Sequence, residues 1–471
     1  MTITRKIVRA SKYRHVFGSG SKKEACYDGA RVSLDSNDWH LVKANTRFMS
    51  IHWDSVGGGS FLIHPHSATG RLANNPPLYT GHTGPVLDTD FHPFNEQVIA
   101  SAGEDGRILL WNIPEQGPTE PSNKHVGELK GHERRIIDLS WNPAVNSLIS
   151  SASHDMTVRI WDVTAARCKV VLSGHFEAAL DQCWSLMGDR LATSCRDKDI
   201  RVFDPRKDGK AVLSKSKAHP GIKGTRVAWL GTEEQLVTTG FGRASEREVS
   251  LWDCRRFDSP ITTLTVDSAS GPLLPYYDAD CKILYLGGRG DGNIRYYEMI
   301  PEEPYFYFLS EYKSTDPQRG LALLPKRAVN TAESEIARFI KVYGSQPILE
   351  PISFKVPRRS NSLTNDAVSS EIYPETLAAE PTMSVQEYFE GINRPPRRVS
   401  IVAATNNNIA SCPGFILPKA TKEDNQTEEP KTEETLSKAY KLLKREMEQL
   451  KNELDQKTVR IRQLEALINK Q

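Results

Sequence analysis

The 471-residue sequence lacks a hydrophobic run long enough to cross a bilayer. No apolar stretch approaches the ~18 residues that a spanning helix needs. The N-terminal segment is basic, but no hydrophobic segment follows it. We therefore expect neither a transmembrane helix nor a secretory signal.

The cysteines also lack any pattern. They are seven in number, odd and dispersed, with no C-x-x-C spacing: Cys26, Cys168, Cys183, Cys195, Cys254, Cys281 and Cys412. This argues against a zinc site or a disulfide framework and predicts reduced thiols in the cytosol. The segment His64-Pro65-His66 has no third ligand at a recognisable spacing. We expect no metal and no cofactor.

A strong excess of one charge is absent as well. The net charge is only +2, and no contiguous stripe of basic and aromatic residues is present. A protein directed as a whole at polyanions would be much more basic. We expect no nucleic-acid partner.

A repeated pair of residues dominates the middle of the chain. Five times an acidic residue is followed six residues later by a large aromatic residue: Asp105/Trp111, Asp155/Trp161, Asp197/Phe203, Glu246/Trp252 and Asp291/Tyr297. Upstream of four pairs stands a small residue followed by His: Gly81-His82, Gly131-His132, Gly174-His175 and Ala218-His219. A period of about 40–45 residues with these marks is typical of a WD-repeat β-propeller blade.

In two repeats the pattern is complete. The resemblance to WD repeats assigns a buried hydrogen-bonded tetrad to each: His82, Ser101, Asp105 and Trp111, and His132, Ser151, Asp155 and Trp161. Buried indole and hydroxyl donors need acceptors, so such a chain stabilises a blade. A nucleophilic triad would be the catalytic interpretation, but the recurrence of the tetrad favours a structural role. We expect no catalytic residue and no enzyme.

The later repeats depart from this pattern. Phe203 replaces Trp and loses the indole donor, Glu246 replaces Asp after a longer loop, and Asp267 stands where His is expected. We expect these blades to depend more on packing than on the polar chain.

The blade count predicts a closed ring of seven. Residues 82–298 supply five blades. Arg31–Leu34, Arg47–Ile51 and Phe61–His64 indicate one before them, and Tyr305–Ser310, Gly320–Leu324 and Ile336–Tyr343 one after. A closed ring must hide its edge strands. We expect Ile7-Val8-Arg9 or His15-Val16-Phe17 to supply the last strand of the final blade, which gives a propeller over residues 1–345.

The composition changes after the propeller. Residues 346–357 are apolar but punctuated by proline, and we expect an extension packed on the propeller. Residues 358–434 are rich in Pro, Ser, Asn, Thr and Glu with few aromatics, which is typical of a flexible, disordered linker.

Unbroken heptads predict a parallel α-helical coiled coil over residues 435–471. The expected oligomerisation residues are Leu443, Met447, Leu450, Leu454, Arg460, Ile461, Leu464, Glu465 and Ile468. Ile461 with Leu464 favours a dimer. However, Arg460 to Glu465 resembles the short Arg-h-x-x-h-Glu motif (h apolar) of trimeric coils, in which Arg and Glu pair between helices. We expect a homotrimer, with a dimer as the alternative.

Together, a seven-bladed WD propeller, a variable linker and a short coil resemble the coronin family, in its short, actin-binding form. Three stretches strengthen the resemblance: residues 8–18 (VRASKYRHVFG), 81–88 (GHTGPVLD) and 351–357 (PISFKVP). The resemblance covers residues 3–357 and 436–471; the linker shows none.

The resemblance implies binding and bundling of actin filaments, with regulation of the branch-nucleating actin-related protein complex as a further role. It implies a cytoplasmic, cytoskeletal location at the cortical actin. Arg31 matches the position where coronins carry a filament-contacting arginine. Seven basic residues precede the first acidic one and would steer encounter with an acidic filament: Arg5, Lys6, Arg9, Lys12, Arg14, Lys22 and Lys23. Peripheral phosphoinositide contact by these residues is an alternative use of the same charge.

The expected mechanism is avidity, because a coil that joins several weak propellers can gain ~10²–10⁴ in apparent affinity. The alternative function is a scaffold for another cytosolic complex, since WD propellers bind many partners.

Overall fold

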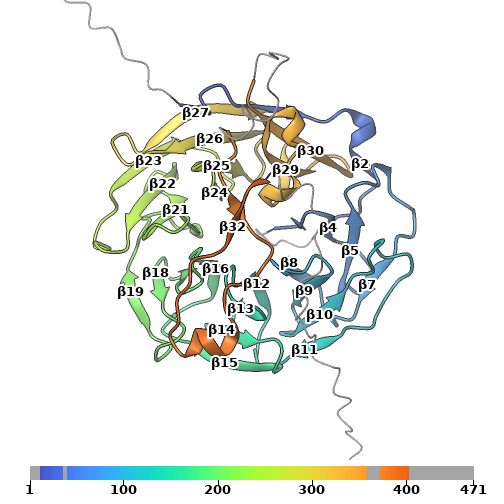
Figure 1. Ribbon diagram of the computed structural model, residues 1–471, viewed down its shortest axis with the longest axis horizontal. Helices are drawn as coiled ribbons and strands as arrows, with labels where there is room; N and C mark the ends of the chain where they lie inside the picture. Colours follow the sequence, from blue (N-terminus) through green and yellow to red (C-terminus); the bar gives the residue numbers. More distant parts are fainter. Residues whose placement is uncertain (1–10, 35–39, 358–371, 402–471) are drawn as a thin grey trace, which may run out of the picture. The chain divides into compact units, whose positions relative to one another are not determined.

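The computed structural model describes residues 11–34, 40–357 and 372–401. All described residues belong to one compact unit. Seven sheets stand around a central channel (Figure 1). The predicted seven-bladed propeller is confirmed. The predicted coiled coil and its residues lie outside the described residues.

Six blades are four-stranded antiparallel sheets. Their strands are, blade by blade, β3 (Val42–Ala44), β4 (Phe48–His52), β5 (Ser60–Pro65) and β7 (Leu78–Thr80); β8 (Val86–Phe91), β9 (Val98–Gly103), β10 (Ile108–Asn112) and β11 (Gly127–Leu129); β12 (Ile136–Trp141), β13 (Leu148–Ser153), β14 (Val158–Asp162) and β15 (Arg167–Leu172); β16 (Ala179–Trp184), β17 (Leu191–Cys195), β18 (Ile200–Phe203) and β19 (Ala211–Lys215); β20 (Arg226–Trp229), β21 (Gln235–Phe241), β22 (Arg247–Asp253) and β23 (Thr262–Asp267); β24 (Leu273–Asp278), β25 (Ile283–Gly288), β26 (Asn293–Met299) and β27 (Phe306–Lys313).

The first blade uses a different inner strand from the one expected. Val42–Ala44 forms β3 beside β4, whereas Val32 in the predicted strand Arg31–Leu34 makes only an isolated bridge to Trp53. The sixth blade takes Phe306–Lys313 as its outer strand, so the predicted strand Tyr305–Ser310 does not belong to the last blade.

The inner strands are joined from blade to blade by buried aspartates. An Asp88 oxygen accepts from the backbone N–H of Leu139 at 2.8 Å, and Asp181 accepts from Val227 at 2.7 Å. Each bond links an inner strand to its counterpart in the next blade. Because a buried N–H that lacks an acceptor is costly, these bonds tie neighbouring blades together.

The seventh blade closes the ring with both ends of the propeller sequence. It is a six-stranded sheet built from β28 (Gln318–Leu323), β29 (Glu335–Tyr343), β30 (Ile348–Lys355), β1 (Phe17–Gly20), β2 (Tyr27–Asp28) and β6 (Gly70–Arg71). Short 3-10 helices η2 (Lys326–Ala328) and η3 (Thr331–Glu333) connect β28 to β29. Strand β1 pairs antiparallel with β30, from Phe17 opposite Lys355 to Gly20 opposite Ile352. An N-terminal strand thus covers the edge of the final blade.

Residues 346–357, which we predicted to be an extension packed on the propeller, contribute a strand to this sheet. This strand, β30, lies between β29 and the N-terminal strands and is hydrogen-bonded on both sides. The prolines gave the impression of an irregular segment. Pro351 lacks a backbone N–H, but its carbonyl still accepts from the backbone N–H of Ser21 at 3.1 Å.

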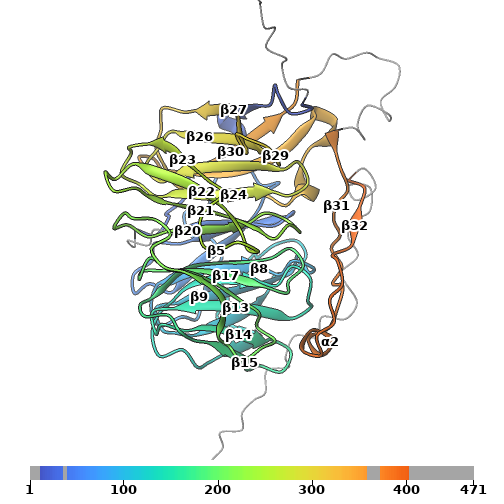
Figure 2. The same ribbon diagram turned by 90° about the vertical axis from the view of Figure 1, so that its left-hand side faces the viewer.

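Part of the predicted flexible linker is instead an ordered segment. Residues 372–401, which we call the strap, run across one face of the propeller (Figure 2). The strap contains β31 (Thr376–Leu377), the helix α2 (Val385–Phe389) and β32 (Arg398–Val399), and β31 pairs with β32. Residues 358–371 and 402–434 of the predicted linker lie outside the described residues.

The strap is held by a few buried side chains and backbone bonds. Tyr388 is fully buried and packs with Met383 against residues of the third and fourth blades. The backbone N–H of Asn146 donates to the Met383 carbonyl at 3.1 Å, and Tyr373 donates to the Glu335 carbonyl at 2.8 Å. These apolar residues are too sparse to form a core of their own, but they fill hollows that the propeller provides.

Candidate functional site

The two complete tetrads are brought together by the structure. In the second blade, His82 Nδ1 lies 3.0 Å from an Asp105 oxygen, and its Nε2 lies 2.8 Å from Ser101 Oγ. Trp111 Nε1 donates to the same hydroxyl at 2.8 Å. A carboxylate can only accept, so Nδ1 carries the proton and Nε2 accepts from the serine O–H.

The third blade repeats this geometry. His132 lies 2.7 Å from both Asp155 and Ser151, and Trp161 donates to Ser151 at 2.8 Å. Burial works against the charge of Asp155, but hydrogen bonds from His132 and Thr157 hold the pKa of its carboxyl well below the usual range. Ser151 is fully buried and its hydroxyl is used twice. Each tetrad therefore serves the packing of its blade.

The later repeats keep part of the chain with other residues. In the fourth blade, His175 bonds Thr193 at 3.0 Å while Phe203 packs on the imidazole. In the fifth, Trp252 donates to Thr238 at 2.8 Å, and His219 lies 2.9 Å from the same hydroxyl.

The acidic residue beside His219 in the fifth blade differs from the one that we predicted. Glu248, at 3.5 Å from His219, takes the place that we predicted for Glu246. The long β21–β22 hairpin places Glu248 opposite Gly240, which packs on the imidazole of His219. The register of this hairpin could not be read from residue spacing alone.

A buried arginine replaces the tetrad between the fifth and sixth blades. Arg247 donates to Asp267 and to Asp291, each at 2.6 Å, and its side chain is 1% exposed. Partial burial opposes the charge of Asp267, but hydrogen bonds from Arg247 and Arg295 lower the pKa of Asp267 to about 2. The expectation that these blades depend mainly on packing is therefore wrong here, because Asp267 takes part in an ionic network.

Arg31 lies exposed at the edge of the first blade. Its carbonyl accepts from the backbone N–H of Asp54 at 2.8 Å, and the neighbouring Val32 bridges to Trp53. Trp53 and Asp54 form the turn after β4, the second strand of that blade. Arg31 is therefore fixed by its backbone beside this turn.

The other predicted contact residues that the structure describes do not form one cluster. Lys12 and Arg14 are exposed on either side of Tyr13, which donates to the Ile372 carbonyl of the strap at 3.0 Å. Lys22 and Lys23 are exposed at the opposite end of β1, where the 3-10 helix η1 (Lys23–Ala25) begins. Arg5, Lys6 and Arg9 lie outside the described residues.

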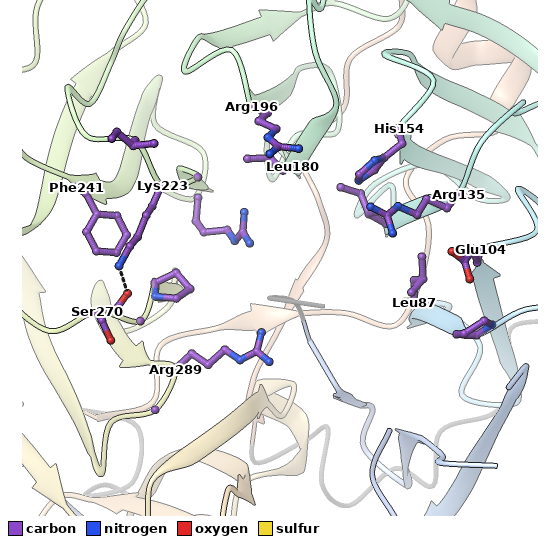
Figure 3. A pocket seen from close by; sticks show the side chains of 18 residues that line it. Leu87, Glu104, Arg135, His154, Leu180, Arg196, Lys223, Phe241, Ser270 and Arg289 are labelled. Carbon is purple, nitrogen blue, oxygen red and sulfur yellow. Dashed lines mark hydrogen bonds between the residues drawn. The ribbon is translucent and has the colours of Figure 1, made fainter. Parts of the chain in front are cut away.

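A cavity of about 990 Å³ opens at one end of the central channel (Figure 3). We call it the channel mouth. It is lined by the turns that follow the second strands and by the loops that precede the inner strands, and its charged residues are Glu104, Arg135, Arg196, Lys223, Arg226 and Arg289. The inner strands end at the loops that the strap covers, such as Pro93, Phe94 and Pro143. The channel mouth and the strap therefore lie at opposite ends of the channel.

The sequence analysis missed the channel mouth. A signal existed, because the first residue after the second strand points there in four blades: Glu104, His154, Arg196 and Arg289. These residues are scattered along the chain, and only the ring brings them to one opening. Arg31 lies beside the corresponding turn of the first blade, and so on the same face.

No metal centre emerges in the part of the chain that the structure describes, where no group of three or more His, Cys, Asp or Glu is suitably placed. His64 and His66 each bond a backbone carbonyl, of Ala68 at 2.7 Å and Asn45 at 3.0 Å. Among the described residues, no helix is long and apolar enough to span a membrane.

Comparison with known proteins assigns the family. Models of the WD domain, G-beta repeat, match residues 75–112, 123–162 and 166–204, a further type of WD40 repeat matches 349–396, and a domain of unknown function (DUF1899) matches 6–71. The sequence is 45% identical to Coronin-A of Dictyostelium discoideum over 98% of this chain and 99% of that protein. The chain belongs to the coronin family.

Other coronins agree over similar lengths. Human Coronin-2B is 41% identical over 99% of this chain and 97% of its own. The solved WD40 domain of Toxoplasma gondii coronin superposes with a TM-score of 0.76 at 32% identity, and covers 82% of this chain and 97% of the solved chain. The match over residues 349–396 covers nearly all of β30 and most of the strap, so most of the strap falls within a recognised repeat model.

Proposed function

We propose that this coronin binds actin filaments through the propeller face that carries Arg31. The observation that supports this most directly is the setting of that residue. Arg31 is exposed, whereas its neighbours Ala30 and Val32 are buried at 3% and 9% exposure, and its carbonyl is bonded to Asp54. A side chain on a rigid backbone loses less entropy on binding than one on a free loop.

The basic residues divide between two roles in this proposal. Lys22 and Lys23 lie at the far end of β1 from the strap and supply positive charge that attracts an acidic filament. Lys12 and Arg14 lie beside the strap, so we assign them only long-range attraction of the filament and no direct contact with it. Arg5, Lys6 and Arg9 are proposed to steer in the same way, and contact with phosphoinositides would use the same charges.

The coil is proposed to multiply the contact. A homotrimer of residues 435–471 would join three propellers, and the second and third binding events would become intramolecular. Such an assembly bundles filaments at the cortical cytoskeleton. Regulation of the branch-nucleating actin-related protein complex would follow from filament binding in the same place.

Filament cosedimentation tests the role of Arg31. We expect Arg31→Asp to weaken binding by about tenfold or more, because it replaces a favourable charge with a repulsive one. Arg167→Asp is the matched control: Arg167 is exposed on the outer strand β15, and its variant should bind as the parent chain does. A salt series should weaken the parent more steeply than Arg31→Asp. Equal binding by all three chains would contradict the proposal and favour a scaffold for another complex.

A further inference from the structure

The channel mouth concentrates positive charge from four blades. Arg135 precedes β12, Arg196 follows β17, Lys223 and Arg226 stand at the start of the fifth blade, and Arg289 follows β25. Glu104 is the only carboxylate among the described residues that line it. Figure 3 shows Arg135, Arg196 and Arg289 reaching into the opening from different sides.

The contacts of Arg196 and Lys223 leave most of the charge of these two side chains available. Arg196 pairs with Glu177 at 3.7 Å, but its side chain is 70% exposed, so the pair is weak. Lys223 donates to the carbonyl of Ser270, which is neutral. Burial and then the charges of Arg135, Arg196 and Arg134 lower the pKa of His154. The potential in the opening is therefore positive and favours an anion.

Apolar side chains are interleaved with these cations. Leu87, Ile137 and Leu180 line the wall, and Ile222 at the rim is 91% exposed. A small polyphosphate would gain nothing from these groups. A peptide that carries both carboxylates and an apolar side chain complements both kinds of surface.

Carboxyl groups line the channel below the mouth. A second cavity of about 350 Å³ is lined by Asp90, Asp138 and Asp181 together with Lys43. Burial opposes the charge of Lys43, but the neighbouring carboxylates raise its pKa, so this lysine is committed to them. Lys43 is therefore occupied by its own carboxyl neighbours, and the cations that an anionic ligand can reach are those of the mouth.

We propose that the channel mouth binds an acidic peptide segment of a partner protein, with its carboxylates on Arg135, Arg196 and Arg289 and an apolar side chain against Leu87, Ile137 and Leu180. Arg31 does not line this site, although it lies on the same face of the propeller.

Fluorescence anisotropy on the full chain tests this proposal. The probe is a short fluorescent peptide rich in Glu with a central Leu-Phe pair. We expect saturable binding that weakens as salt is raised, and a loss of about tenfold or more in Arg135→Glu/Arg196→Glu. Arg167→Glu and Arg31→Asp should bind the probe as the parent chain does. Arg135→Gln/Arg196→Gln removes the two charges without adding repulsion, so its loss of binding should be smaller than that of the Glu variant. It tests the same charges even if the reversed charges impair folding.

Three competitors decide the chemistry. The same peptide with Gln in place of Glu, and the same peptide with Ser in place of Leu-Phe, should each compete poorly. Inositol hexakisphosphate should also compete poorly. If it or the Ser peptide competes as well as the probe, the ligand is a simple polyanion and the peptide proposal is wrong. The proposal is also overturned if the probe does not bind, or if both double variants bind the probe as tightly as the parent chain does.

Discussion

At the scale of residues, the propeller buries histidines in their neutral form. Burial is the largest cause in every case and lowers each pKa to about 3 or about 4. The residues are His52, His66, His92, His175 and His219. At His175, which is 6% exposed, the charge of Arg201 adds to the effect of burial.

These histidines contribute to how stability depends on pH. An unfolded histidine titrates near ~6.5. Between that pH and the lower folded pKa, the unfolded chain binds more protons, so the free energy of unfolding falls as the pH falls. The stabilisation by neutral histidine is fully present above ~6.5 and is lost toward about pH 4, by up to ~1.4 kcal/mol per pH unit for each group.

Replacing one histidine should remove its contribution to the pH dependence of the free energy of unfolding. Between about pH 7 and about pH 5, we expect His175→Gln to lose about 2 kcal/mol less stability than the parent chain. Urea unfolding at each pH measures this difference. His15→Gln, at an exposed position, is the control and should follow the parent. Identical pH dependence of His175→Gln and the parent would contradict the prediction.

At the scale of elements, the strap depends on a single helix for much of its attachment. Helix α2 begins at a capping box in which Ser384 and Glu387 bond each other's backbone N–H groups. The helix then presents Tyr388 to the propeller, and the guanidinium of Arg206 lies 5.4 Å from the ring. Removing a buried aromatic side chain costs about 3–5 kcal/mol, which is comparable to the stability of a short docked segment.

We therefore expect Tyr388→Ala to release the strap without unfolding the blades. Hydrogen exchange should become faster at the backbone amides of β31, α2 and β32, while the inner strands keep their protection. Gln386→Ala, on the exposed side of the same helix, should exchange as the parent does. Unchanged exchange in Tyr388→Ala would mean that other contacts hold the strap.

At the scale of the whole molecule, we propose that each propeller offers a single filament surface and that the predicted coil multiplies the contact. The gain depends on the linker, whose reach must match the spacing of binding sites. Weak individual contacts would then suffice for tight binding by the assembly.

A chain that ends at residue 430 tests this arrangement. We expect it to lose filament bundling and up to ~10²–10⁴ of apparent affinity, because each propeller then binds alone. Cosedimentation at high and low speed separates binding from bundling. Fusion of residues 1–430 to an unrelated trimeric coil should restore both. Undiminished bundling by the truncated chain would contradict the avidity mechanism.

Prediction from sequence succeeded where a blade is specified locally. The spacing of His132, Ser151, Asp155 and Trp161 determines one hydrogen-bonded chain within a single sheet, and the period then counts the blades. It failed where the register depends on the length of a hairpin, as for Glu248, or where a different residue type fills the position, as for Arg247. In both cases the replacement is visible only once neighbouring strands are paired.

The sequence by itself determined the seven-bladed ring and the coronin family, because each repeat carries its own strands, turns and polar pairs within about 45 residues. Only the tertiary structure decided the place of residues 346–357 in the last blade, the docking of the strap and the composition of the channel mouth. Each of these brings together residues that are distant in the chain. Tyr388 is buried in a hollow formed by other blades, and Arg135, Arg196 and Arg289 become one positive opening only when the ring closes.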